Sequence, residues 1–193
     1  MVEQHPLSPF LPEKSRLLML GSFPPPRSRW CMDFFYPNYI NDMWRIFGIV
    51  FMNDKNAFVN TKAKTFAEEK IRNLLNEKGI AIYDTASKVN RLNNNASDKF
   101  LEILEPTDIL RLASEIPLCK AIVATGGKAA EETARQLGVQ IPLIAKPATV
   151  RVNGKEMQFW RMPSSSRAYP LALEKKAEYY RTMFLETGIA TEK

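Results

Sequence analysis

The sequence predicts a single α/β domain of three layers, in which helices cover both faces of a mostly parallel central sheet. Three observations support this fold class. Short apolar runs alternate along the chain with amphipathic segments of helical period. The apolar runs are hydrophobic at nearly every position, as are strands that are buried on both faces. The chain has 193 residues, and one domain usually has ~100 to 200. We therefore expect one domain over residues 1–193, with residues 1–14 as an N-terminal tail.

The first half of the chain predicts two strands and two helices. Residues 16–20 are a short apolar run that a glycine and three prolines end, which indicates a buried strand followed by a sharp turn. Residues 41–52 place large apolar side chains at three- and four-residue steps, the spacing of one helix face. Residues 66–78 have glutamates in the first turn and a glycine after the last, which favour a helix. Residues 80–83 then form a second buried strand.

The second half repeats this alternation. The predicted elements are, in order, a helix over 107–115, a strand over 120–125, a helix over 128–137, a strand over 143–145, strands over 150–152 and 157–161, and a helix over 171–185. The last two strands flank Asn153-Gly154, a pair favoured in two-residue hairpin turns because both positions need positive φ. In a parallel sheet of this kind, a ligand lies beyond the carboxyl ends of the strands.

The chain is basic, and its positive charge is unevenly distributed. Lys and Arg number 27 and Asp and Glu number 21, for a formal charge of +6 and a pI of about 9.3. Residues 146–181 carry eight basic and three acidic side chains, so 8 − 3 places +5 of the +6 in that segment. A basic face of this kind suits a polyanion such as DNA, because each neutralised phosphate releases counterions. The alternative is a solvated surface with no partner.

Composition excludes several classes of protein. Hydrophobic residues make up 45% of the chain and charged residues 25%, as in folded globular proteins. The longest apolar run, residues 46–52, is far shorter than the roughly 18 residues of a membrane span, so we expect a soluble, cytoplasmic protein. Cys31, Cys119 and His5 are too few for a zinc or iron–sulfur site or for a histidine-based catalytic triad. We therefore expect no metal site.

The first candidate site is the turn after the first predicted strand, formed by Gly21, Ser22, Phe23 and Pro24. Its glycine and prolines favour a rigid turn whose free backbone N–H groups could face a ligand. The alternative is a plain break between strand and loop.

The second candidate site is an aromatic stretch over residues 34–45. Its rings, Phe35, Tyr36 and Trp44 among them, could form a stacking platform for a flat ligand, mixed with polar side chains such as Asn41. The alternative is a helix N-terminus in which Asn41 is the cap and Trp44 lies in the core.

The third candidate site is the segment that leaves the last predicted strand. Pro163, Ser164, Ser165, Ser166 and Arg167 lie within the basic segment. Small hydroxyl side chains and their backbone N–H groups can approach a phosphate backbone closely. The alternative is a Ser/Pro turn before the last helix.

Two further features are weaker candidates. Gly126-Gly127-Lys128 lacks the spacing of a phosphate-binding loop, so we interpret its glycines as packing residues between a strand and a helix. Asp84 follows a predicted strand and Asp98 lies in a loop, where each carboxylate could serve as a cap or as a catalytic group.

These segments, in this order, resemble the motifs of the uracil-DNA glycosylase superfamily, most closely its hypoxanthine-DNA and mismatch-specific uracil-DNA glycosylase branches. The resemblance covers residues 17–185. The similar motifs are the Gly-x-x-Pro turn at residues 20–24, the aromatic His-Pro-x-Asn-x-Phe-Trp segment at 36–44 with Asn41 and Trp44 in register, the strand-end Asp at Asp84 with Ser-Asp at 96–98, the Gly-x-x-Ala helix start at 125–129, and the second motif, Leu-Pro-Ser-Thr-Ser in the hypoxanthine branch, at 162–166.

The resemblance implies a DNA glycosylase that removes a deaminated base, needs no cofactor and acts as a monomer. It implies that Asn41 is the catalytic residue. The residues it assigns to base binding are Gly21, Ser22, Phe23, Pro24, Phe35, Tyr36 and Trp44, and those it assigns to DNA binding are Pro163, Ser164, Ser165, Ser166, Arg167 and Lys128.

The chain departs from the family at four places. Ser22 and Phe23 stand in the first motif where the mismatch-specific branch has a water-activating Asn, and Pro25 replaces a Gly. Asn38 follows Pro37 where the family has His-Pro, and Met162 opens the second motif in place of His or Asn. The chemistry therefore rests on Asn41, and the base that is removed stays open between hypoxanthine and uracil.

Two other functions fit the same residues. The chain could be a catalytically weak or inactive DNA-binding relative with the same fold. It could also be a nucleotide- or sugar-phosphate-binding enzyme that uses Gly126-Gly127-Lys128 on a Rossmann-like sheet.

Overall fold

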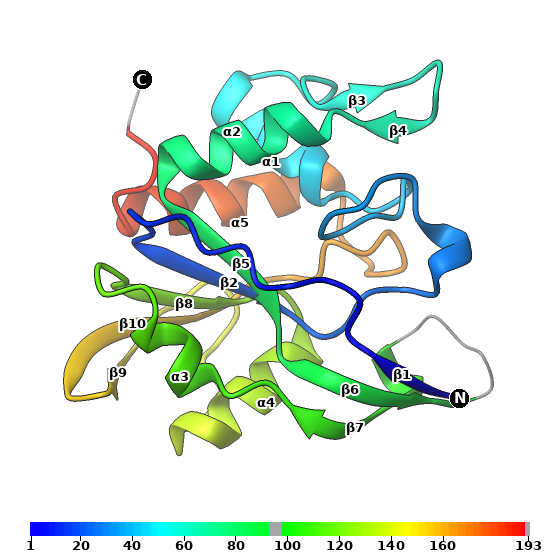
Figure 1. Ribbon diagram of the computed structural model, residues 1–193. Coiled ribbons are helices and arrows are strands. Elements are labelled where there is room, and N and C mark those ends of the chain that lie inside the picture. Colours follow the sequence, from blue (N-terminus) through cyan, green and yellow to red (C-terminus); the bar gives the residue numbers. More distant parts are fainter. Residues whose placement is uncertain (93–97, 192–193) are drawn as a thin grey trace.

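The structure, a computed structural model, describes residues 1–92 and 98–191 of the chain. A five-stranded sheet forms its centre, with the strand order β5-β2-β8-β10-β9 (Figure 1). These strands are β2 (Leu17–Gly21), β5 (Ile80–Asp84), β8 (Ala121–Ala124), β9 (Ala148–Val152) and β10 (Lys155–Arg161). All neighbouring pairs are parallel except β9 and β10.

Helices cover both faces of this sheet, as Figure 1 shows. One face carries α1 (Met43–Met52), α2 (Glu68–Lys78) and α5 (Leu173–Glu186). The other carries α3 (Ile109–Ser114) and α4 (Gly127–Leu137). The predicted three-layer α/β class is therefore confirmed.

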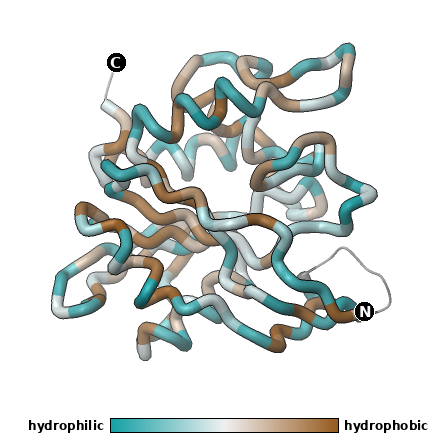
Figure 2. Tube along the Cα trace, viewed as in Figure 1, coloured by the Kyte–Doolittle hydropathy of each residue, from teal (hydrophilic) through white to brown (hydrophobic). Residues whose placement is uncertain are grey.

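The core is built around the central strands. Every residue of β2, β5 and β8 is buried, which is the expected result of covering a sheet on both faces. Figure 2 shows the hydrophobic trace concentrated along these strands. Trp160 and Phe159 of β10 are fully buried beside them.

The Asn-Gly signal is confirmed. Asn153 and Gly154 join β9 to β10 with φ values of 49° and 79°, so both turn positions lie in the left-handed region. The hairpin places the carboxyl end of β10 beside that of β8.

The prediction that residues 1–14 form an N-terminal tail is wrong. Residues 2–4 form β1, which pairs antiparallel with β6 (Ala86–Arg91). Strand β6 pairs in turn with β7 (Leu101–Pro106), so that β1-β6-β7 is a second, three-stranded sheet. Phe10 forms an isolated bridge with Ile82 at the edge of the central sheet. A strand of three mostly polar residues has no apolar alternation, and it forms because β6 offers an unpaired edge.

Other differences are local. The predicted strand over 143–145 is wrong: Ile144 makes only an isolated bridge to Arg161. Prolines at 142 and 147 flank it and cannot donate to a ladder. The structure also has a short hairpin of β3 (Val59–Asn60) and β4 (Thr65–Phe66) that no pattern predicted. Single turns of 3-10 helix occur at Arg27–Arg29 (η1) and Asp98–Phe100 (η3).

Gly79 ends α2 in a left-handed conformation, with φ +68°, and a Cβ there would lie 2.5 Å from the backbone oxygen of Lys14. Gly138 ends α4 with φ +65° and open space around it. We expect Gly138→Ala to destabilise by about 1 kcal/mol, the cost of a left-handed non-glycine residue. Gly79→Ala should cost at least about 1 kcal/mol more, because the backbone must also move. Urea unfolding of both variants measures this difference, and equal losses would contradict the steric argument.

Burial raises the pKa of the Cys119 thiol from 9.0 to about 11. The Cys119 thiol therefore stays neutral in the folded chain at pH values at which the same thiol ionises in the unfolded chain. Its contribution to stability is fully present below pH 9 and is lost as pH rises toward 11. We expect the unfolding free energy of Cys119→Ala to fall less over this range than that of the wild type, by about 2 to 3 kcal/mol. Parallel pH profiles of the two proteins in urea would disprove this.

Candidate functional site

A cavity of about 560 Å³ opens at the carboxyl ends of β2, β5 and β8. Its size is within the range of sites for small organic groups. The residues that line it are 21–25, 29, 35–38, 40, 41, 84, 125, 126, 129 and 164–170. Three of the predicted segments thus meet at one place, at the carboxyl ends of parallel strands, where a parallel sheet was predicted to bind a ligand.

The first wall is the turn after β2. A side chain at position 21 would overlap the Asp84 carboxylate, which explains why the turn begins with glycine. Among the described residues, the backbone N–H groups of Ser22 and Phe23 have no protein acceptor. The Pro24 carbonyl points the other way and accepts a hydrogen bond from Arg91 Nη2 at 2.9 Å. The turn therefore offers donors to the cavity.

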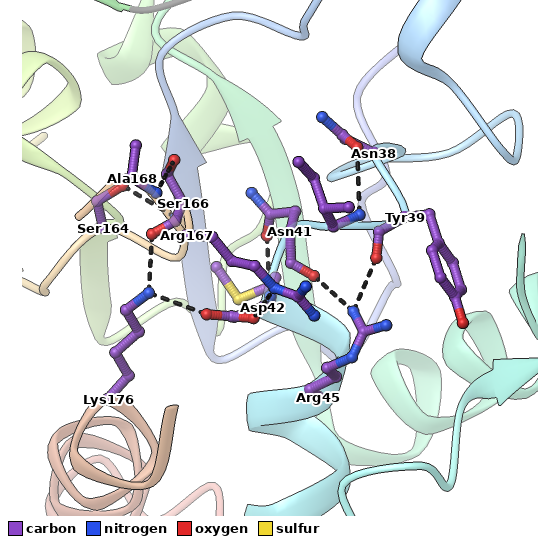
Figure 3. A network of polar contacts seen from close by, with 12 residues as sticks. Asn38, Tyr39, Asn41, Asp42, Arg45, Ser164, Ser166, Arg167, Ala168 and Lys176 are labelled. Atoms are coloured by element: carbon purple, nitrogen blue, oxygen red, sulfur yellow. Dashed lines mark hydrogen bonds and ion pairs between the residues drawn. The ribbon is translucent and has the colours of Figure 1, made fainter. Parts of the chain in front are cut away.

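The second wall comes from the aromatic stretch. Phe35 is almost fully buried, and Tyr36 has φ 50° and shares a hydrogen bond of 2.7 Å with Thr125 Oγ1. Asn41 Oδ1 accepts the backbone N–H of Met43 at 2.9 Å, at the start of α1. This bond fixes the amide group, and its Nδ2 has no protein acceptor among the described residues (Figure 3).

The third wall is the loop after β10, and a buried ionic network joins it to the second wall (Figure 3). Asp42 receives Arg167 Nε on one oxygen at 3.1 Å and Lys176 Nζ on the other at 3.0 Å. Lys176 Nζ also donates to the Ser166 carbonyl at 2.8 Å, and the Asp42 N–H donates to the Ser165 carbonyl at 2.9 Å. The side chains of Asp42 and Lys176 are 7% and 1% exposed. The network holds Asn41, the neighbour of Asp42, against residues 164–167 of the loop after β10, which we call the serine loop.

Arg45 is a third cation, and it supports the backbone of the second wall. Its Nη1 donates to the carbonyls of Tyr39 and Asn41 at 2.8 and 3.0 Å. Burial lowers the pKa of Arg45, and the positive charge of Arg167 lowers it further. These bonds hold the backbone on both sides of Ile40, next to Asn41 in the cavity lining.

Most of the predicted site residues line this cavity. Those that do are Gly21, Ser22, Phe23, Pro24, Phe35, Tyr36, Asn41, Ser164, Ser165, Ser166 and Arg167. Three others do not. Trp44 lies in the core, where its indole N–H donates to the Phe35 carbonyl at 3.0 Å. Pro163 is buried, and its carbonyl accepts from Tyr180 Oη at 3.2 Å. Lys128 lies half-exposed in the first turn of α4, behind Gly126 and Ala129.

Sequence reasoning missed the role of His5. Its side chain is 1% exposed, and its Nε2 lies 2.8 Å from Asp84 Oδ2, so the expected tail reaches the cavity wall. Nothing local to a lone histidine in a polar segment indicates such a partner. The weaker candidate Asp84 does line the cavity, whereas residues 96 and 97 lie outside the described residues.

The basic segment over 146–181 is not one exposed face. Lys176 is buried in the network with Asp42, and Arg181 donates to the Ile49 carbonyl at 3.0 Å. The exposed cations that line the cavity are instead Arg29 and Arg167. Other exposed cations of the segment, such as Arg151 and Lys155 on the β9–β10 hairpin, lie outside the cavity lining.

Comparison with known proteins identifies the fold. No protein-family model matches the chain, and no curated protein matches it. Among solved structures, the chain is similar to the solution NMR structure of a "putative Uracil DNA glycosylase from Methanosarcina acetivorans". The TM-score is 0.64 at 21% identity, over 97% of this chain and 99% of that chain. At this identity the match shows a shared fold, which agrees with the α/β class predicted above.

The described residues include neither a membrane-spanning helix nor a cluster of metal-binding side chains. No helix in that part of the chain is long and apolar enough to cross a membrane. No group of three or more His, Cys, Asp and Glu side chains there could hold a metal ion.

The Asp42 network generates a prediction about stability. Lys176→Met keeps the volume of the side chain but leaves Asp42 with one cation fewer, and removing one partner of a buried pair costs about 3 kcal/mol or more. The neighbouring Lys175, paired with Glu178 on the surface, is the matched control. We expect Lys176→Met to lower the urea midpoint strongly and Lys175→Met to leave it unchanged. Equal midpoints would show that the network contributes nothing.

Proposed function

We propose that the protein is a DNA base-excision glycosylase that hydrolyses the N-glycosidic bond of a deaminated base, hypoxanthine or uracil. The observation that carries the proposal is the convergence on one cavity of the Gly21 turn, the Asn41 amide and the serine loop. The fold shared with a structure described as a uracil DNA glycosylase supports the same conclusion.

The glycosidic bond of a base stacked in a duplex is out of reach of the catalytic groups, so the nucleotide must flip into the cavity. The unstacking cost of a few kcal/mol is recovered by new stacking and by hydrogen bonds to the edge of the base. The cavity lining has four aromatic residues, Phe23, Phe35, Tyr36 and Tyr169, and we assign contact with the flipped ring to the first three.

The backbone amides of the first turn stabilise the departing base. As the glycosidic bond breaks, negative charge collects on the base and its carbonyl oxygen. The N–H groups of Ser22 and Phe23 are fixed donors that need no reorganisation. One such donor is worth about 3 to 4 kcal/mol of transition-state stabilisation.

Asn41 orients the attacking water or hydrogen-bonds the base through Nδ2. An amide is a weak base, but the sugar develops cation-like character and needs little activation of its nucleophile. Positioning alone can therefore supply much of the rate. The bond from Met43 N–H to Asn41 Oδ1 provides that positioning, because it fixes the side chain.

The cavity mouth contacts the DNA backbone. The cavity lining there combines hydroxyl groups with exposed guanidinium groups, which come from Ser164, Ser166, Arg167 and Arg29. We assign Lys128, at the N-terminal end of α4 and outside the cavity lining, to a flanking phosphate, where the helix dipole adds to its charge. The proposed hydrolysis, with Asn41 and the backbone amides of the first turn, requires neither a metal nor an organic cofactor.

The test is excision from duplex and single-stranded oligonucleotides that carry one hypoxanthine, uracil, xanthine or mismatched thymine, followed by alkaline strand cleavage. We expect Asn41→Ala to lower the single-turnover rate on the competent base at least about 100-fold. Asn41→Asp keeps the oxygen that accepts the Met43 N–H but lacks Nδ2, so it should fold normally and lose most of the activity.

Asn38→Ala is the matched control, because Asn38 also lines the cavity and its Oδ1 accepts the Ile40 N–H. We expect that variant to keep nearly full activity. A loss within about threefold for Asn41→Ala, or roughly 0.7 kcal/mol, would remove Asn41 from the mechanism. Absence of cleavage on every base, with salt-sensitive binding to the same DNA, would favour the inactive DNA-binding relative.

A further inference from the structure

A buried histidine–carboxylate pair lies in the wall of the cavity and has no part in the function proposed so far. His5 Nε2 is 2.8 Å from Asp84 Oδ2, and the two side chains are 1% and 9% exposed. Asp84 lines the cavity, whereas His5 lies behind it. A buried carboxylate needs a hydrogen-bonding or charged partner, and several kinds of side chain could serve. A functional role would explain why this partner is a histidine from the far N-terminus.

The ring has a defined orientation. Nε2 faces the Asp84 carboxylate, which accepts, so in the neutral ring Nε2 carries the hydrogen and Nδ1 accepts the Leu7 N–H at 3.1 Å. The Leu7 carbonyl lies 2.9 Å from the same Nδ1 and can accept from it when the ring is charged. Nε2 therefore donates to Asp84 in both protonation states.

Aromatic residues of the site enclose the ring. Its centroid lies 4.7 Å from Tyr83, 5.2 Å from Phe23 and 6.2 Å from Phe35. The N-terminal segment is held in place by β1 on β6 (Figure 1) and by Glu3, which receives Arg91 Nε at 2.6 Å. Arg91 in turn donates to Pro24 in the first turn. The segment thus braces both the turn and the carboxylate.

The geometry separates the two oxygens of Asp84. Oδ2 faces His5, and Oδ1 faces the Cα of Gly21, whose turn carries the N–H groups of Ser22 and Phe23. An ionised carboxylate is an acceptor only. The cavity therefore presents backbone donors beside a fixed side-chain acceptor.

We propose that His5 is a positioning residue for base selection: it holds Asp84 so that Oδ1 accepts an N–H of the flipped base while the turn donates to the adjacent carbonyl. This inference rests on the proposed function. Hypoxanthine and uracil carry the required carbonyl and N–H side by side. Adenine and cytosine carry an amino donor and an unprotonated ring nitrogen at those positions, so each would place donor against donor and acceptor against acceptor.

The experiment compares His5→Phe, which keeps an aromatic ring but removes the donor, with His5→Gln, whose amide N–H replaces Nε2–H. Each is made in the wild type and in Asp84→Ala, and single-turnover rate and half-saturation are measured on duplexes with hypoxanthine, uracil, adenine or cytosine. We expect His5→Phe to lose roughly 10- to 100-fold on the deaminated bases, the scale of one hydrogen bond to a charged group. His5→Gln should stay within about threefold of wild type, and His5→Phe should have no further effect in Asp84→Ala.

Equal activity of His5→Phe and wild type, or equal losses from His5→Phe in both backgrounds, would overturn the positioning role and leave the glycosylase function intact. If the wild type cleaves none of the bases, the proposed function and this inference fail together. If His5→Phe does not fold, the isosteric Asp84→Asn decides. In that variant the His5 N–H would hold the amide oxygen of the new side chain, so that its NH₂ group would face the N–H of the base. An unchanged rate on hypoxanthine and uracil would therefore overturn the proposal.

Discussion

The burial of strand β2 between two neighbours is the constraint on which the rest of the structure depends. All of its residues are buried, and it pairs in parallel with β5 on one side and β8 on the other. Parallel pairing brings the carboxyl ends of strands to the same edge, and the register places Gly21 opposite Asp84 and Leu20 opposite Ala124. The pairing of the strands therefore brings the turn, the carboxylate and Thr125 together at one edge of the sheet.

The remaining parts of the site are held by ionic contacts that a hydrophobic core cannot provide. Asp42 is nearly inaccessible to solvent and is acceptable there only because Arg167 and Lys176 neutralise it. This network joins the start of α1 to the loop after β10, two segments that share no strand. It also lies one residue from Asn41, so its rigidity is passed directly to the proposed catalytic amide. Apolar packing would have left that loop free to slide, whereas charged hydrogen bonds define its direction.

The N-terminal segment shows how a short edge strand can matter for chemistry. Strand β1 contributes little apolar surface, since two of its three residues are exposed. The N-terminal segment adds polar contacts instead: Glu3 of β1 pairs with Arg91, and His5, which follows β1, pairs with Asp84. Both contacts end at the cavity wall. A segment of this kind is retained for the groups it orients and not for the area it buries.

The sequence by itself determined the elements whose signals are local. Apolar runs predicted β2, β5 and β8, and Asn153-Gly154 predicted the hairpin. The residues after β2 and β10 indicated most of the cavity lining. Only the tertiary structure decided which distant groups pair. His5 and Asp84 are 79 positions apart, and Asp42 and Lys176 are 134 apart. A hydrophobic period reports which face of a segment is buried, but a polar pair depends on the position of both segments in space, and no pattern within either segment encodes that position.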